Sequence, residues 1–411
     1  MTLNDSIAMY FDETKRACTS NEKLWDKNIY GPLLIVDPIS RKAYANEPDT
    51  LGILKPDGKI FIGKLPYNVV IANANVKWSG KNWAMVLLPF ISKVKEDRIN
   101  LLAHELFHRS QLSLGFENKD ANNNHLDTKN GRVYLRLELN ALIKALESKS
   151  KKEAARHLNN AVLFRKHRHA LFPGADSTEN AMELNEGLAE YTGTYISRGS
   201  LKEATPNLIR KIKDFQNGGT FVRTFPYRTI PVYGFFLQET KKYWNKEIKM
   251  STPLTEYFVW ELKLSIPDDI AKIVLQISKE YDFDSVNAQE TEREEKTKAL
   301  LNEYRKKFIE LPHLTITFEN KKSSFDSRNL TPLDDKGVVY PTMTVSDNWG
   351  VLTIDKVGGL MSPNRDKVTI TAPKNIDGLN ITGEGWTIKL TEGYQVLKSN
   401  DGSENYILQK K

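Results

Sequence analysis

Short runs of alternating apolar and polar residues mark the first 90 residues of the chain. A helix is predicted over residues 5–24, ahead of these runs. Strand-like runs then follow at Gly31–Asp37, Lys59–Leu65, Tyr67–Trp78 and Asn82–Phe90. The turn sequence SGKN separates the last two runs and predicts a β-hairpin. The pattern therefore predicts a small, mostly antiparallel sheet over about residues 30–90.

A helical spacing of apolar residues replaces the alternation over about residues 92–310. The segment SKVKEDRINLLAHELFHRSQLSLG begins at Ser92, a favourable N-cap, and stops at Gly115, a favourable C-cap. A later helix carries ELNEGLAEYTG and opens with Asp176 and Glu179 in the spacing of a capping box. This region is predicted to be the helical part of a first domain, residues 1–311.

The last hundred residues return to short alternating runs separated by glycine, asparagine and aspartate. These runs are LTITF, GVLTI, KVTITA, WTIKL, YQVLK and NYILQ. They predict a second, all-β domain over residues 312–411, either a sandwich or a barrel. Trp349 and Trp386 fit its core, or else exposed platforms for stacking on sugar or peptide. The expected fold class is α+β.

Composition narrows the classes of protein to consider. The 411 residues include 59 basic and 52 acidic ones, a net charge of +7 without the pattern of a nucleic-acid-binding protein. The single cysteine, Cys18, excludes an internal disulfide and a cysteine-based metal cluster. No apolar run approaches the roughly 18 residues of a membrane span. The N-terminus lacks a signal peptide, which leaves a cytoplasmic chain or a mature exported chain with an added methionine.

The segment HELFH carries the clearest chemistry in the sequence. His104 and His108 are four residues apart, so on a helix both imidazoles project from one face, one turn apart. This spacing suits two zinc ligands, and Glu105 beside them can act as a general base on water without being a ligand. The alternative is an ordinary amphipathic helix with core or surface histidines.

A third ligand is needed for a catalytic zinc site, and ELNEGLAEYTG offers carboxylates. Glu183, Glu186 and Glu190 are predicted to share one helix face, on a helix whose apolar neighbours indicate burial. Buried carboxylates require a cation or strong hydrogen bonds. Glu138 is an alternative third ligand. The basic run Arg165–His169 is expected to be a solvated face.

The HExxH helix followed by N-E-G-x-A-x-Y resembles the gluzincin zinc metallopeptidases, closest to the aminopeptidase N and thermolysin-like superfamily. The resemblance implies a zincin-like domain in which Glu186 is the third zinc ligand and Glu190 orients a ligating histidine. No G-x-M-E-N signature precedes the helix, so the resemblance supports a metallopeptidase rather than an aminopeptidase.

Two further roles are implied by the same resemblance. In that fold the edge strand before the zinc helix binds the substrate backbone, and WAMVLLPF is the matching segment, with Ala84, Met85 and Val86 as substrate-binding residues. A downstream tyrosine stabilises the oxyanion, which FPYRTIPVYGFF matches with Tyr227 first and Tyr233 second.

The sequence thus predicts a metallopeptidase that holds one Zn²⁺ per chain and cleaves a peptide or protein through a zinc-activated water, with Glu105 as general base. No nucleic-acid partner and no transmembrane segment are expected. Two alternatives stay open: a non-catalytic, metal-stabilised protein whose β domain binds glycan or protein, and a zinc hydrolase acting on another substrate.

Overall fold

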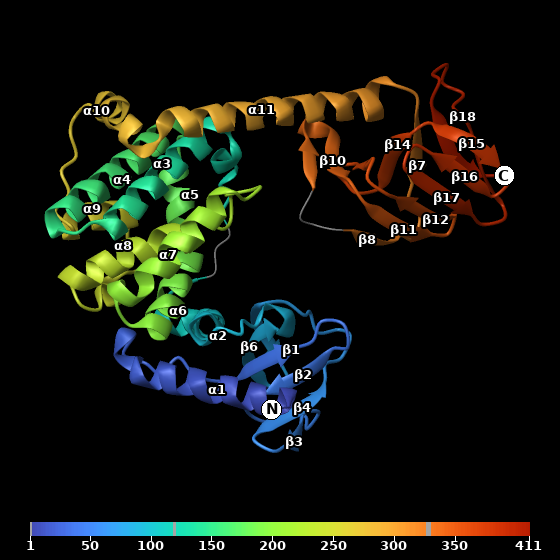
Figure 1. The fold of residues 1–411 in the computed structure, drawn as a ribbon. Coiled ribbons are helices and arrows are strands. Elements are labelled where there is room, and N and C mark those ends of the chain that lie inside the picture. Colours follow the sequence, from blue (N-terminus) through green and yellow to red (C-terminus); the bar gives the residue numbers. More distant parts are fainter. Residues whose placement is uncertain (1, 118–120, 326–329) are drawn as a thin grey trace. The chain divides into compact units, whose positions relative to one another are not determined.

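The computed structural model describes residues 2–117, 121–325 and 330–411. The chain forms two compact units, residues 1–291 and 292–411, which divide within helix α11 (Phe283–Arg305). The first unit combines a sheet with many helices, and the second is built mainly of strands (Figure 1). This composition confirms the α+β class. The boundary expected from the sequence falls after Leu311.

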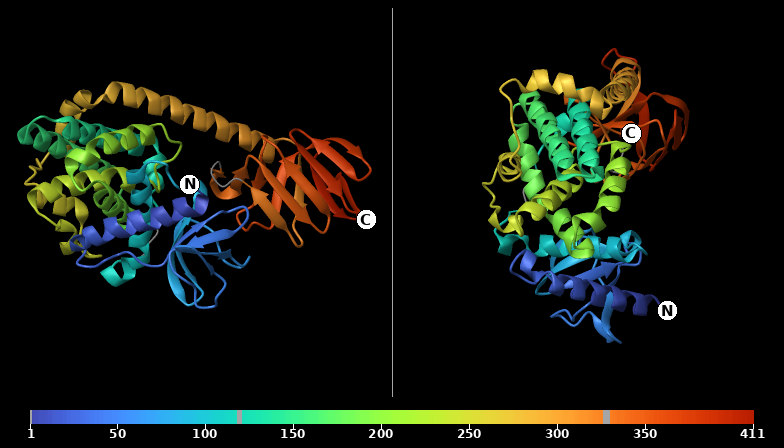
Figure 2. Two further views of the ribbon diagram at one scale, coloured as in Figure 1. Left: turned by 60° about the horizontal axis from the view of Figure 1, so that its bottom comes forward. Right: turned by 60° about the vertical axis from the view of Figure 1, so that its left-hand side comes forward.

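The first unit begins with helix α1 (Leu3–Ser20), which lies alongside a six-stranded sheet (Figure 2). The strands are β1 (Leu33–Val36), β2 (Lys42–Ala45), β3 (Lys55–Asp57), β4 (Ile60–Lys64), β5 (Ala74–Trp78) and β6 (Lys81–Leu87). Their order in the sheet is β3-β4-β2-β1-β6-β5. Among these neighbours, β1 and β6 run parallel and the other pairs run antiparallel. The sheet is therefore mostly antiparallel, as predicted.

The hairpin predicted at SGKN joins β5 to β6. Ser79 and Gly80 form a two-residue turn with φ of 46° and 71°, the left-handed conformation that suits tight hairpins. The prediction that WAMVLLPF is the edge strand is wrong, because β6 pairs with β1 on one side and with β5 on the other. The edge beside β6 is β5.

Successive residues of a strand point to opposite faces of the sheet. In the central strands both faces are covered by an apolar cluster. Leu33 and Ile35 of β1 join the large core that also contains Phe11 of α1 and Leu102 of α2. Leu34 of β1 joins a smaller apolar cluster on the other face. The sheet is thereby fixed against α2 (Lys95–Ser110), the helix that carries HELFH.

The rest of the helical part joins α2 through α6 (Leu188–Arg198), which packs closely against it (Figure 1). Its further elements are α3 (Lys129–Glu147), α4 (Lys151–Leu171), α5 (Ala175–Met182), the π-helical turn η5 (Glu183–Gly187), α7 (Leu201–Gln216), α8 (Pro226–Thr240), α9 (Leu254–Glu261) and α10 (Ile270–Ile277). No helix within the described ranges is both long enough and apolar enough to cross a membrane.

Two predicted helix caps are wrong. Ser92 does not cap α2, because the helix starts at Lys95 and the Ser92 hydroxyl accepts a hydrogen bond from the Val94 amide two residues away. Asp176 and Glu179 form no capping box, because Gly174 is the N-cap of α5. Glu179 is drawn instead into a buried ion pair with Arg168.

The second unit contains two sheets that share one apolar core and so form a sandwich. Its strands are β7 (His313–Thr317), β8 (Lys322–Phe325), β9 (Thr331–Leu333), β10 (Gly337–Tyr340), β11 (Met343–Asp347), β12 (Gly350–Ile354), β13 (Gly359–Met361), β14 (Lys367–Thr371), β15 (Pro373–Asp377), β16 (Asn380–Gly383), β17 (Trp386–Leu390), β18 (Tyr394–Lys398) and β19 (Tyr406–Lys410). Trp349 and Trp386 are both buried in this core, so neither is an exposed stacking platform.

Candidate metal centre

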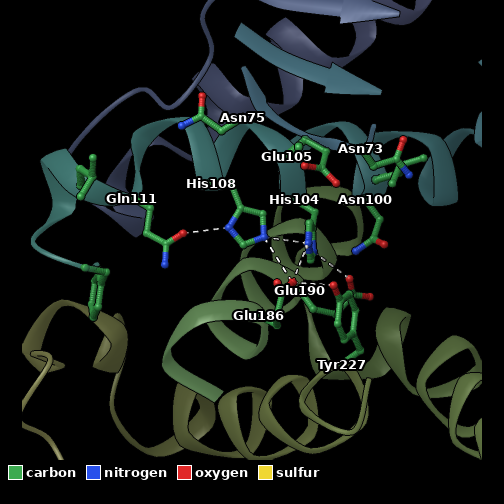
Figure 3. Close-up of a pocket in the computed structure, with 14 residues that line it drawn as sticks. Asn73, Asn75, Asn100, His104, Glu105, His108, Gln111, Glu186, Glu190 and Tyr227 are labelled. Atoms are coloured by element: carbon green, nitrogen blue, oxygen red, sulfur yellow. Dashed lines mark hydrogen bonds and ion pairs between the residues drawn. The ribbon is translucent and has the colours of Figure 1, made fainter. Parts of the chain in front are cut away.

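Helix α2 places the two histidines as their spacing predicts. The Nε2 atoms of His104 and His108 face each other at 3.1 Å. The carboxylate of Glu186 completes a group of three, with Oε2 at 3.5 Å from His104 Nε2 and 3.3 Å from His108 Nε2 (Figure 3). One ligand atom from each residue lies within 4.8 Å of the others.

Glu186 reaches the histidines from the π-helical turn η5, which lies between α5 and α6. A π-turn holds an extra residue and rotates the following side chains relative to an α-helix. Glu183 therefore points away from the histidines and binds Arg165 at 2.7 Å, while Glu186 and Glu190 face His104. The prediction that all three carboxylates share one face is wrong for this reason.

Two glycines of ELNEGLAEYTG let neighbouring helices approach the site closely. A Cβ atom at Gly193 would lie 2.5 Å from the carbonyl oxygen of Asn100, so α6 could not pack as it does against α2. A Cβ atom at Gly187 would lie 2.4 Å from Ile230 on α8. These contacts bring α6 against α2 and bring α8, which carries Tyr227, against η5.

The outer nitrogen of each histidine has its own acceptor. His104 Nδ1 lies 3.2 Å from Glu190 Oε2, and His108 Nδ1 lies 2.8 Å from the side-chain oxygen of Gln111. Gln111 in turn donates to the Asn185 side chain at 2.9 Å, which orients its oxygen toward the ring. With the ring protons on Nδ1, both Nε2 lone pairs would face Glu186 and be available to bind a shared cation.

This donor set requires a positive charge. Burial disfavours protonation of His104, but the Glu186 and Glu190 carboxylates outweigh it and raise the pKa of the ring to about 10. Burial likewise opposes ionisation of Glu186, yet the two histidines hold its pKa well below the usual range. Two imidazole nitrogens and one carboxylate are ligands that zinc prefers, so the residues present fit a zinc ion.

Glu105 and Tyr227 flank the three converging groups (Figure 3). Glu105 is buried, its Oε2 has no hydrogen-bond partner among the described residues, and burial raises the pKa of its carboxyl group. Tyr227 stacks on His104 with ring centroids 5.2 Å apart and donates its hydroxyl to Glu186 Oε2 at 2.5 Å. Burial and the Glu186 charge raise the pKa of Tyr227.

These groups lie in a pocket of about 460 Å³. Asn73, Ala74 and Asn75, at the start of edge strand β5, line one side of it. Ala84, Met85 and Val86, the expected substrate-binding residues, belong to β6, where their side chains are fully buried and the backbone is paired on both sides. The strand that a substrate could reach is β5, whose sequence is more polar.

Tyr233 and Glu138 do not join the site. The Tyr233 hydroxyl donates to Glu138 Oε1 at 3.0 Å, in a buried network apart from the pocket lining. Glu138 also accepts from Arg165 at 2.8 Å and from Arg168 at 2.9 Å, which occupies both of its oxygens. The structure brings Glu186, not Glu138, to the histidines.

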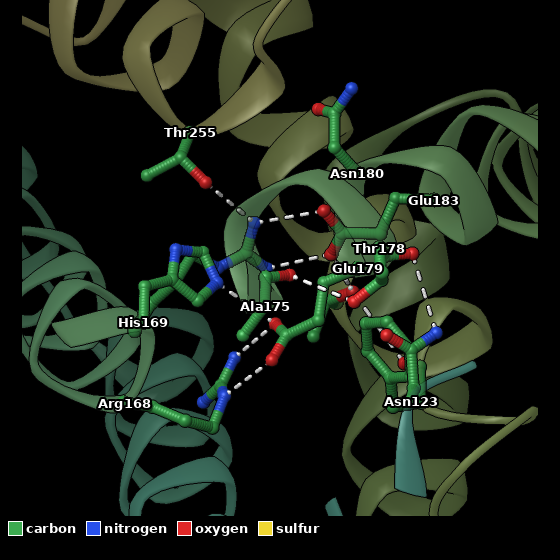
Figure 4. A network of polar contacts seen from close by, with 12 residues as sticks. Asn123, Arg168, His169, Ala175, Thr178, Glu179, Asn180, Glu183 and Thr255 are labelled. Atoms are coloured by element: carbon green, nitrogen blue, oxygen red, sulfur yellow. Dashed lines mark hydrogen bonds and ion pairs between the residues drawn. The ribbon is translucent and has the colours of Figure 1, made fainter. Parts of the chain in front are cut away.

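The same network overturns the prediction of a solvated basic face at Arg165–His169. Arg165 and Arg168 are fully buried. The Arg168 guanidinium forms a bidentate ion pair with the Glu179 carboxylate, with N···O distances of 2.6 and 2.8 Å. His169 Nε2 lies 3.1 Å from the same carboxylate (Figure 4). Arg165, Arg168 and His169 therefore bind carboxylates inside the helical part, while Lys166 is partly exposed and pairs with Glu256.

The sequence reasoning missed Gln111 and Lys211. Gln111 lies three residues after His108 on the same helical stretch, so its spacing was a usable signal. Lys211, on α7, contacts Glu190 at 2.7 Å, and no local pattern marks it.

Comparisons with known protein families, with characterised proteins and with solved structures find no match for this chain.

Proposed function

We propose that this chain is a zinc-dependent metallopeptidase that hydrolyses peptide bonds. The observation that carries the proposal is the convergence of His104, His108 and Glu186 beside the unpaired carboxylate oxygen of Glu105. His104 Nε2, His108 Nε2 and Glu186 would hold the metal. When bound, zinc supplies a Lewis acid for a carbonyl oxygen and for water.

Glu105 is suited to move the proton in this reaction. Its free Oε2 can accept a proton from an attacking water and return it to the leaving amine. A raised pKa brings the carboxyl group nearer to neutral pH, where both transfers are efficient. A buried carboxylate oxygen without a hydrogen-bond partner among the described residues would be a net cost in a purely structural site.

Tyr227 and strand β5 are suited to hold the substrate. The Tyr227 hydroxyl can turn from Glu186 to donate a hydrogen bond to the oxyanion of the transition state. Strand β5 is the sheet edge at the pocket, so an extended peptide can pair with its free backbone groups. Glu190 and Gln111 fix the rotation of the two histidine rings.

The second candidate is a metal-stabilised binding protein, and the third is a zinc hydrolase of another substrate class. The free carboxylate of Glu105 favours a hydrolase over a binding protein. Assays with a peptide library and with a panel of simple esters and amides would distinguish a metallopeptidase from a zinc hydrolase of another substrate class. Cleavage of peptides that stops with a chelator and returns with zinc is the expected result.

Metal content is the first experiment, measured by elemental mass spectrometry on wild type, His104→Ala and His313→Ala. We expect about one zinc per chain in wild type and in His313→Ala, whose histidine lies on β7 in the second unit. His104→Ala should carry none. If wild type binds no zinc even after zinc is added back, the site is not a zinc centre and the proposal is wrong.

A further inference from the structure

Three connections of the first unit leave its sheet at the same end. Strands β1 and β6 run parallel, and β4 runs in the same direction because both β1 and β4 are antiparallel to β2. The segments that follow these strands, residues 37–41, 65–73 and 88–94, therefore lie at the same end of the sheet. The first two are joined directly, since the Leu65 amide donates to the Arg41 carbonyl at 3.0 Å.

This end of the sheet exposes large apolar side chains from all three connections. They are Ile39 (93% exposed), Tyr67 (82%), Val70 (76%), Phe90 (61%) and Val94 (53%). Single exposed apolar residues are common on soluble proteins, but five of them at one end of a sheet indicate an interaction surface. We name these five residues the apolar tip.

Arg41 holds the connection after β4 in place by hydrogen bonds. The Arg41 guanidinium donates to the carbonyl oxygens of Leu65 at 3.1 Å, Pro66 at 2.5 Å and Val69 at 2.6 Å. Arg41 and Lys64 also lie over the Tyr67 ring, at 5.3 and 5.7 Å from its centroid. These contacts tie the backbone around Tyr67 to Arg41.

Basic residues outnumber acidic ones on and directly beside the three connections. The three connections and the residues directly flanking them carry Arg41, Lys42, Lys64, Lys93 and Lys95, against a single acidic residue, Asp37. The Asp37 carboxylate accepts hydrogen bonds from the Ile39 amide and the Ser40 hydroxyl of its own turn. The combination of exposed apolar side chains and a basic rim is complementary to a surface that is apolar inside and negatively charged outside.

We infer that the apolar tip docks on an anionic lipid membrane surface, with the five side chains in the headgroup region and the lysines against lipid phosphates. Aromatic side chains such as Tyr67 and Phe90 favour this depth, and clustered lysines are attracted to anionic lipids. Docking of a second copy through the same face would bring like charges together. The inference does not depend on the proposed catalytic function.

Vesicle co-sedimentation tests the inference on the full chain. The probes are vesicles of phosphatidylcholine alone and vesicles with about one third phosphatidylglycerol. We expect binding to the anionic vesicles, at least tenfold weaker binding to the neutral ones, and weakening as salt rises from about 0.05 to about 0.5 M. The double variant Tyr67→Ser/Phe90→Ser should bind the anionic vesicles at least tenfold more weakly than wild type.

The matched control is Leu51→Ser, because Leu51 is 71% exposed on the same unit, between β2 and β3, and lies outside the apolar tip. It should bind as wild type does, and thermal melting should show all variants folded. No binding to either vesicle, equal binding to both, or equal losses in the control and the double variant would each overturn the inference. So would a concentration-dependent dimer that the double variant abolishes without any vesicle binding.

Discussion

Lys211 and Glu190 form an ion pair behind the histidines. The Lys211 ammonium lies 2.7 Å from Glu190 Oε1, and the other oxygen of that carboxylate lies 3.2 Å from His104 Nδ1. Burial would raise the pKa of Glu190, but Lys211 and His104 hold it well below the usual range. The lysine therefore keeps the carboxylate ionised at the back of the imidazole, where it fixes the ring.

Removal of this lysine is expected to weaken zinc binding. Lys211→Ala leaves Glu190 without its cation, and loss of such an outer partner costs about tenfold to a hundredfold in metal affinity. Competition with a chelator measures the affinity without reference to catalysis. Lys211→Arg should restore most of it, and Lys213→Ala, exposed on the same helix, should have no effect. Unchanged affinity in Lys211→Ala would show that the ion pair does not act on the metal.

The variant Glu105→Gln is predicted to retain zinc and to lose hydrolysis. Glutamine has the same shape as glutamate but cannot accept the proton, and general acid–base groups contribute about 10²- to 10⁴-fold. Zinc content and peptide cleavage are measured on the same sample. Full cleavage by this variant would exclude Glu105 as the base, whereas loss of zinc would mean that it helps to hold the metal.

The two tyrosines are predicted to respond differently to loss of the hydroxyl. Tyr227→Phe should lower kcat about 10²-fold with little change in stability, because its hydroxyl lies at the pocket beside Glu186. Tyr233→Phe should lower the free energy of unfolding by about 1–3 kcal/mol, because it removes a donor from the buried Glu138 carboxylate. Initial rates and chemical denaturation of both variants provide the comparison. The opposite pattern would make Tyr233 the functional residue.

Local periodicity was sufficient to predict the histidine pair and the elements around it. The spacing of His104 and His108 fixes their common face on any regular helix, and no distant residue can change that. Local patterns also predict the SGKN turn and the order of a sheet, a helical region and a second all-β region along the chain. Each of these features depends on residues close together in the chain.

The errors arose where distant residues decide the outcome. The sequence predicts the wrong face for Glu183 because no local feature marks the π-helical turn that contains Glu183 and Glu186. In the sequence, Arg165 and Arg168 resemble a solvated basic run. In the structure, their partners Glu138 and Glu179 come from the separate helices α3 and α5. The central position of β6 fits its continuous apolar run, which is typical of a strand buried on both faces, whereas the edge assignment came from the family resemblance alone.

Glu138→Ala is predicted to destabilise the first unit without removing zinc. The substitution leaves Arg165 and Arg168 buried without one of their carboxylate partners, and breaking a buried ion pair costs about 3–5 kcal/mol. Thermal melting and zinc content test the two halves of the prediction. Glu147→Ala, at the exposed end of the same helix, is the control. Loss of zinc in a variant that melts like wild type would instead identify Glu138 as the third ligand.

Acid is expected to weaken the first unit through Glu179. Burial would raise the pKa of Glu179, but Arg168 outweighs it and holds the value well below the ordinary 4.5. Because the folded-state pKa is the lower one, the stabilisation is fully present above about pH 4.5 and is lost as the pH falls further. Melting temperatures of zinc-free protein between about pH 7 and pH 3 should therefore drop steeply at the acid end. Glu179→Gln should melt lower at pH 7 and show a shallower acid drop, whereas Glu239→Gln, exposed at the end of α8, should follow wild type. An equally steep drop in Glu179→Gln would assign the acid sensitivity to other carboxylates.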